Sequence, residues 1–133
     1  MDAIEAVLKE YNTIAVVGLS DNPWRPSHSV SAYMREHGYK IIPVNPNHKT
    51  LLGVPCYPDI AAIPEPVAIV NIFRRPEAVP AIVDQAIAIN ARVIWMQLGV
   101  YHAEAAEKAT RAGLTVIMDR CIKIEHRRIF SAS

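Results

Sequence analysis

The chain has 133 residues, of which 51% are hydrophobic and 20% charged, so it can form one domain with a substantial core. Fourteen lysines and arginines against thirteen acidic residues give a formal charge of +1, unlike the large basic excess of nucleic-acid-binding proteins. The same composition excludes intrinsic disorder over most of the length, because disorder requires low hydrophobicity together with a high net charge.

The sequence contains no recognisable membrane span or secretory signal. Its longest apolar runs have four or five residues, far fewer than the ~20 that a spanning helix needs. The stretch from Met1 to Glu5 is acidic, whereas a secretory signal begins with basic residues. Cys56 and Cys121 lie 65 residues apart without a CxxC motif, which is typical of a reducing compartment. We therefore expect a cytoplasmic protein with a single domain over residues 1–133.

Five short apolar runs, rich in β-branched residues, recur with starts 23 to 27 residues apart. They are continuous rather than alternating, as expected of strands buried on both faces of a parallel sheet. The runs cover residues 13–17, 40–44, 67–73, 92–96 and 115–118.

Amphipathic patterns next to these runs predict helices over 3–11, 29–37, 76–89 and 102–112. Segment 45–66 holds five of the ten prolines, so we expect mostly loop there, with a short helix near 59–63. The alternation of strands and helices predicts an α/β fold with a doubly wound, mainly parallel five-stranded sheet.

In such a sheet the ligand binds at the carboxyl ends of the strands, so the residues that follow each strand are the candidates. Four of the five strand ends offer a cation: Arg25, Lys49, Arg74 with Arg75, and Arg120. A nearly neutral protein that gathers cations at one edge is suited to an anion such as a phosphorylated nucleotide.

The loop after the first strand is the strongest single feature. Gly18 permits a tight turn beside a ligand, and the hydroxyls of Ser20 and Ser27 can donate hydrogen bonds. Ser27, His28 or Ser29 can open the following helix, whose free N–H groups would hold a phosphate.

Motifs for other nucleotides are missing. Of the dinucleotide fingerprint G-x-G-x-x-G only Gly18 is present, and Asn45-Pro46 stands where an acid would bind the ribose hydroxyls. No G-x-x-x-x-G-K-[ST] motif occurs. The five histidines lack a paired metal-ligand spacing, and no nucleophile–base–orienter set is visible. Two interpretations of Cys121 stay open: a small buried side chain, or a thiol facing the ligand.

The motifs taken together resemble those of the single-domain CoA-binding proteins, and the resemblance extends over almost the whole chain. They are Gly18-x-Ser20, Pro23-x-Arg25-Pro26-Ser27, Gly38-Tyr39, Pro43-Val44-Asn45-Pro46, Phe73-Arg74, Trp95-x-Gln97-x-Gly99 and Asp119-Arg120-Cys121. That family is similar in fold to the Rossmann-like CoA-binding domain at the N-terminus of the succinyl-CoA synthetase α-subunit.

The resemblance implies that the first loop cradles CoA, that the nucleotide end lies near the turn after the second strand, and that the pantetheine crosses the ends of the third and fourth strands. The synthetase's active-site histidine belongs to a second domain, so the resemblance does not imply ligase activity. The expected cofactor-binding residues are Gly18, Ser20, Arg25, Ser27, His28, Val44, Asn45, Pro46, Lys49, Phe73, Arg74, Gln97, Gly99 and Arg120.

We therefore expect a module that binds CoA or an acyl-CoA as a carrier, sensor or regulator, without a catalytic set of its own and without a metal. The alternative is an enzyme, either an NADP-dependent oxidoreductase or a thiol/disulfide-handling protein that uses Cys121. Nucleic acid and membrane are not expected as partners, whereas a protein partner or a homo-oligomer stays open.

Overall fold

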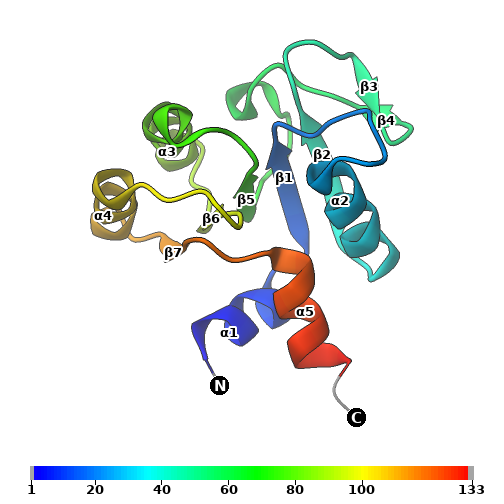
Figure 1. The fold of residues 1–133 in the computed structure, drawn as a ribbon. Helices are drawn as coiled ribbons and strands as arrows, with labels where there is room; N and C mark the ends of the chain where they lie inside the picture. The colour runs from blue at the N-terminus through cyan, green and yellow to red at the C-terminus, as the bar shows by residue number, and fades with distance from the viewer. Residues whose placement is uncertain (1, 132–133) are drawn as a thin grey trace.

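Five parallel strands form the central sheet of the protein, whose computed structural model describes residues 2–131. The strand order is β2-β1-β5-β6-β7, so β1 and β5 lie side by side where the connections leave in opposite directions (Figure 1). This arrangement confirms the expected α/β fold with a parallel sheet. The strands are β1 (Thr13–Val17), β2 (Lys40–Val44), β5 (Ile69–Ile72), β6 (Val93–Met96) and β7 (Thr115–Ile117).

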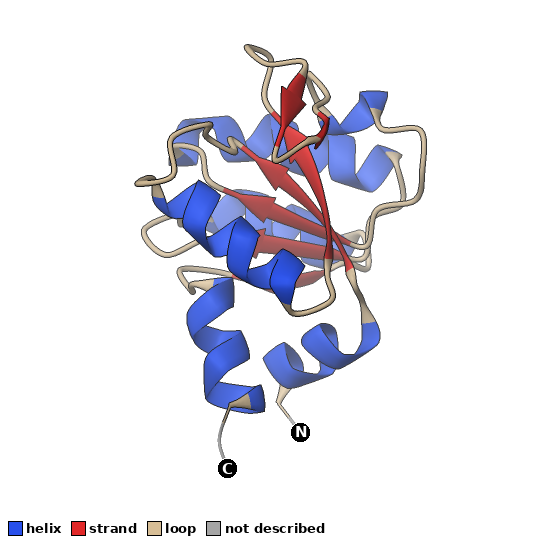
Figure 2. Cartoon of the chain, turned by 90° about the vertical axis from the view of Figure 1, so that its right-hand side faces the viewer, coloured by secondary structure: helices blue, strands red, loops and turns tan. Residues whose placement is uncertain are grey.

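Helices cover both faces of the sheet, which forms the middle layer in Figure 2. On one face, α3 and α4 pack against alternate strand residues such as Ala15 and Val17. On the other face, α1, α2 and α5 pack against the intervening residues, such as Ile14 and Val16. The helices are α1 (Ala3–Glu10), α2 (Pro26–Glu36), α3 (Val79–Ala88), α4 (Ala103–Arg111) and α5 (Ile122–Phe130).

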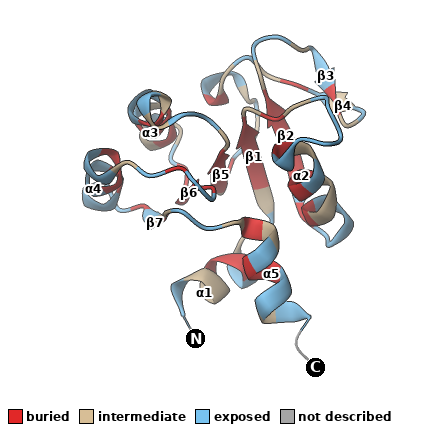
Figure 3. Ribbon diagram, viewed as in Figure 1, coloured by how far each residue is buried: buried red, intermediate tan, exposed pale blue. Residues whose placement is uncertain are grey.

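Burial explains why the strand sequences are apolar without alternation. Every residue of β5 and β6 is buried, and the outward faces of the helices carry the exposed positions (Figure 3). A strand with helices on both faces presents no side chain to water, so apolar residues are favoured at each position.

Three elements differ from the sequence-based expectation. Helix α5 was not predicted, and segment 45–66 contains a small antiparallel hairpin, β3 (Thr50–Leu51) and β4 (Val54–Pro55), before the short helix η1 (Ile60–Ala62). Helix α2 begins at Pro26, three residues before the expected start at 29. Proline suits the first helical position because its φ is already helical and its missing N–H would have no intrahelical partner there.

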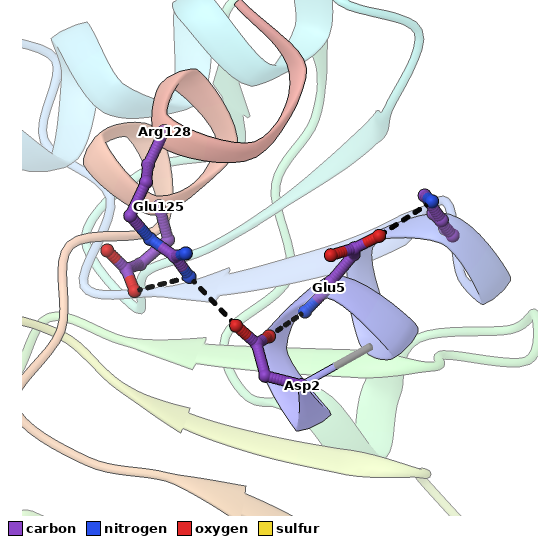
Figure 4. Close-up of polar contacts among 5 residues, drawn as sticks. Asp2, Glu5, Glu125 and Arg128 are labelled. Atoms are coloured by element: carbon purple, nitrogen blue, oxygen red, sulfur yellow. Dashed lines mark hydrogen bonds and ion pairs between the residues drawn. The ribbon is translucent and has the colours of Figure 1, made fainter. Parts of the chain in front are cut away.

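The two terminal helices are joined by a cluster of charges (Figure 4). Asp2 caps α1 by accepting a hydrogen bond from the Glu5 N–H at 2.7 Å, and this bond lowers the pKa of Asp2. The guanidinium of Arg128 on α5 lies 3.4 Å from the other Asp2 oxygen and 3.3 Å from Glu125. This bridge between α1 and α5 is exposed, so it positions the helices more than it stabilises them.

Within residues 2–131, no helix is long and apolar enough to cross a membrane.

A cluster of aromatic and histidine side chains lies where α2 and α5 pack together, beside the start of β2. His126 has 6% of its surface exposed, and its Nδ1 lies 2.8 Å from the Tyr33 hydroxyl. The ring of His37 lies 5.1 Å from that of His126. Burial, and secondarily the neighbouring His37, lowers the pKa of His126.

We predict that acid destabilises the protein through His126. Its folded-state pKa lies below the ordinary value of about 6.5, so the unfolded chain binds a proton that the folded chain resists. The free energy of unfolding should therefore be highest above about pH 7, where His126 is neutral in both states, and should fall as the pH is lowered toward 5. Urea unfolding at several pH values measures this slope. His126→Phe should flatten it, and an equal slope in both proteins would contradict the assignment.

Candidate functional site

A cavity of about 730 Å³ opens at the carboxyl ends of β1, β5 and β6. This is the edge where the strand order reverses and where open α/β sheets bind their ligands. Nine of the residues predicted from the sequence line it: Gly18, Ser20, Arg25, Ser27, Asn45, Phe73, Arg74, Gln97 and Gly99.

The charged side chains in the cavity lining are all arginines. Arg25, Arg74 and Arg75 contribute guanidinium groups, His48 is also part of the lining, and no aspartate or glutamate of residues 2–131 belongs to it. None of these three arginines takes part in an ion pair among the described residues. Unpaired guanidinium groups in a concave surface attract phosphates strongly, because they offer charge-assisted and bidentate hydrogen bonds.

The serines of the first loop shape the loop itself. Ser27 is buried in the first turn of α2, and its Oγ accepts a hydrogen bond from the Ser20 N–H at 3.0 Å. The Oγ of Ser20 in turn accepts from the Asn22 N–H at 3.0 Å. Both oxygens act as acceptors here, which leaves their hydroxyl protons available for a ligand.

Helix α2 offers fewer free N–H groups than the sequence suggested. The N–H groups of His28 and Ser29 both bond to the carbonyl of Arg25, the residue that caps the helix, and Pro26 has no N–H. The remaining donor in the first turn is the Ser27 N–H. Phosphate binding at this helix would therefore rest mainly on one backbone donor and the neighbouring arginines.

Gly18 directly follows β1 and has a φ of +91°, in the region that favours glycine. A Cβ at this position would lie 2.6 Å from the carbonyl oxygen of Phe73 and 2.9 Å from the Cδ of Arg74. The Gly18 N–H bonds to the Val44 carbonyl at 2.9 Å. Gly18 thus lets the chain after β1 lie against the chain after β5. Arg74, in that second segment, lines the cavity.

Asn45 links the first loop to the end of β2. Its Nδ2 donates to the Leu19 carbonyl at 2.9 Å, and its Oδ1 accepts from the Asn47 N–H at 2.9 Å. Its backbone N–H also bonds to the carbonyl of Tyr57. Asn45 therefore holds two loops of the site in a fixed relation.

The chain after β7 turns back over the end of β6 and forms the far wall of the cavity. The Gly99 N–H donates to the Asp119 carboxylate at 2.7 Å, and the indole N–H of Trp95 donates to the Arg120 carbonyl at 2.9 Å. The buried Gln97 accepts from the first N–H of α5 at 3.3 Å. This return brings Cys121 into the lining although β7 is an edge strand. Both interpretations of Cys121 have support, because its side chain lines the cavity and is also partly buried against the core.

A second, smaller cavity of about 220 Å³ lies beside the end of β2. Its walls include Val44, Pro46, Pro58 and Ile60, and Arg74 lines both cavities. Arg74 therefore stands between a small apolar recess and the large cationic cavity.

Five predicted residues lie outside the lining of the large cavity. Val44 and Pro46 belong to the smaller one, whereas His28, Lys49 and Arg120 line neither. The guanidinium of Arg120 donates to the carbonyl of Asp119 at 3.1 Å.

Several lining residues are not among the predicted ligand contacts: Val30, His48, Leu98, Val100 and Ile124. Arg75 also lines the cavity, and the sequence names it only as a cation after the third strand. His48 follows the second strand, and Leu98 and Val100 follow the fourth, so their positions after strand ends could have identified them as lining residues. Ile124 could not be found in this way, because it reaches the site only through the return of α5. Among the described residues, no group of three or more His, Cys, Asp and Glu side chains could hold a metal ion.

Comparisons with known proteins identify relatives of nearly full length. The family described as "CoA binding domain" matches residues 12–127. The "Uncharacterized protein YneT" of Bacillus subtilis is 45% identical over 123 residues, covering 92% of this chain and 91% of that protein. A solved structure, "hypothetical protein from Pyrococcus horikoshii OT3", is 40% identical with a TM-score of 0.92, covering 95% of this chain and 89% of that one.

Larger enzymes match through one part of their length. "Acetate--CoA ligase [ADP-forming] I" of Archaeoglobus fulgidus is 27% identical over 121 residues, which is 82% of this chain and 17% of the ligase. The similarity therefore concerns one segment of a much longer protein.

We predict that Gly18→Ala destabilises the protein by about 3 kcal/mol, because strain at positive φ adds to the contact with the Phe73 carbonyl. Gly113→Ala is the matched control: its φ is +95° but nothing lies within 4 Å of the added Cβ. We expect the control to lose only about 1–2 kcal/mol. Urea unfolding measures both values, and equal losses would show that the approach of β1 to β5 tolerates a methyl group.

Proposed function

The chain belongs to the CoA-binding domain family, and from this premise we propose that it binds CoA across the carboxyl ends of β1, β5 and β6 as a carrier, sensor or regulatory module. The observation that carries the proposal is the cavity lined by Arg25, Arg74 and Arg75, with no aspartate or glutamate side chain among the described residues of its lining. CoA bears a diphosphate and a 3′-phosphate, and such a cavity suits these groups.

The two cavities suggest how CoA would lie. The small recess with Val44, Pro46 and Ile60 suits the flat, apolar faces of the adenine ring. Arg74, between the cavities, would then contact the phosphates. The pantetheine would extend through the large cavity past Gln97 toward Cys121. This orientation agrees with a nucleotide end near the turn after β2.

In this proposal the chain binds CoA and catalyses no reaction of its own. The name of the Archaeoglobus protein refers to acetate and CoA, and this chain matches 17% of that protein. We propose that the shared part of the role is the recognition of CoA.

We predict that Arg25→Ala and Arg74→Ala each weaken CoA binding about tenfold or more, because a hydrogen bond to a charged group contributes about 1.5–3 kcal/mol. Both side chains are exposed, so the melting temperature should scarcely change. Isothermal titration calorimetry with CoA measures the affinities.

Arg92→Ala is the matched control. It removes the same charge from an exposed position that precedes β6, at the opposite edge of the sheet, and CoA affinity should stay unchanged. Equal effects of all three substitutions would show that the loss of one positive charge, and not a contact in the cavity, weakens CoA binding. NAD binding more tightly than CoA in the same titration would overturn the proposed function.

We also predict that Cys121 forms a mixed disulfide with CoA. Its thiolate would attack the disulfide of oxidised CoA, forming the protein–CoA disulfide and releasing one CoA thiol, so no further oxidant is needed. Cys121 is partly exposed and lines the cavity. Intact mass spectrometry should show an adduct of one CoA that a reductant removes.

Two substitutions separate the cysteines in this experiment. Cys121→Ser should abolish the adduct, whereas Cys56→Ser should retain it, since Cys56 is buried and burial raises the pKa of its thiol. An adduct that persists in Cys121→Ser would place the reactive thiol elsewhere. A protein that binds CoA but forms no adduct would leave Cys121 as a packing residue.

A further inference from the structure

The wall of the large cavity opposite the arginines is apolar and open to solvent. Leu98 and Val100 from the loop after β6 meet Cys121 and Ile124 from the start of α5 in the cavity lining. Leu98 is 61% exposed and Ile124 is 54% exposed, although both line the cavity. Large apolar side chains that line a cavity and yet face solvent leave apolar surface uncovered at its mouth.

This wall is held in place by the polar contacts beneath it. The Gly99 N–H bonds to Asp119, and the Val100 N–H bonds to the Gln97 carbonyl at 2.8 Å. Gln97 also accepts from the first N–H of α5, the helix that carries Ile124. The apolar surface is therefore already formed before any ligand binds, which lowers the entropic cost of binding to it.

The charged side chains of the cavity come from other segments than this wall. The lining residues contributed by the loop after β6 and by α5 include no charged side chain, and the arginines come from the first loop and from the segment after β5. A ligand with anionic groups at one end and an apolar group at the other would match both walls. CoA ends in a thiol, and its acyl thioesters carry the apolar group at that same end.

We propose that the protein prefers CoA thioesters of medium-length acyl chains, about four to eight carbons, and that Leu98 and Ile124 contact the chain. This inference rests on the proposed CoA binding and adds the class of ligand. It is supported by Leu98 and Ile124, which are exposed and also line the cavity in which the thiol end of CoA would lie. Because the surface is open, a chain would be covered on one side only.

The expected gain follows from burial of methylene groups. A fully buried methylene strengthens binding about fourfold, and one covered on a single side about twofold. Hexanoyl-CoA, with five carbons beyond the carbonyl, should therefore bind about tenfold or more tightly than CoA. Acetyl-CoA should differ little from CoA, because its single methyl group scarcely reaches the exposed surface.

Isothermal titration calorimetry of the intact protein with CoA, acetyl-CoA and hexanoyl-CoA tests the preference. Leu98→Ser and Ile124→Ser should each lower the ratio of hexanoyl-CoA affinity to CoA affinity about threefold or more, and leave the melting temperature nearly unchanged because both side chains are exposed. Tyr101→Ser is the matched control, since Tyr101 is 58% exposed in the same loop as Leu98 but does not line the cavity. It should behave as the unchanged protein does.

The outcomes separate the two proposals. Binding of CoA with equal affinity for hexanoyl-CoA would overturn the acyl preference and leave CoA binding intact. Binding of neither ligand would overturn the proposed function and the acyl preference with it. A hexanoyl gain that survives both serine substitutions would overturn the assignment of Leu98 and Ile124. Sedimentation of the same variants gives a further check, because a dimer lost in Leu98→Ser would show that a second copy covers this surface instead.

Discussion

The close approach of the chain after β1 to the chain after β5 is the constraint on which the site depends. Gly18 adopts a φ of +91° there, with the space of its absent side chain taken by the Phe73 carbonyl and the Arg74 side chain. Two neighbouring strands whose connections diverge leave a crevice at their carboxyl ends. At this contact the side chain of Arg74 lies against Gly18 and lines both cavities.

A second constraint is the return of the chain from the edge strand β7 to the middle of the sheet. Buried polar groups direct it, because they must find partners once they are removed from water. The Trp95 indole bonds to the Arg120 carbonyl, and the Gln97 carboxamide bonds to the start of α5. The return adds residues of α5 and of the segment before it to the cavity lining. Cys121 and Ile124 reach the site only because these bonds hold α5 across the end of β6.

The charges divide into two groups with different roles. Ion pairs such as Lys9–Glu5 and Arg111–Glu107 lie on exposed helix faces, where solvent screening leaves them little effect on stability. The arginines of the cavity are not among these pairs in the described part of the chain. A chain with a formal charge of +1 thus carries a local excess of positive charge at one edge of its sheet. That local excess, and not the net charge, is what an anionic ligand would meet.

The strands, most of the helices and the strand ends that line the candidate site can be predicted from the sequence, since continuous β-branched runs and amphipathic periods reflect local burial. The sequence also located Gly18, Arg25 and Arg74, because parallel strands bring their carboxyl ends to one edge. Which cations face the cavity cannot be predicted in this way, because Lys49 and Arg120 follow strands as Arg74 does but do not line it. Ile124 likewise joins the lining from an unpredicted helix. A strand's own pattern records which of its residues are buried, whereas the direction of a side chain beyond the strand depends on contacts between segments distant in the chain.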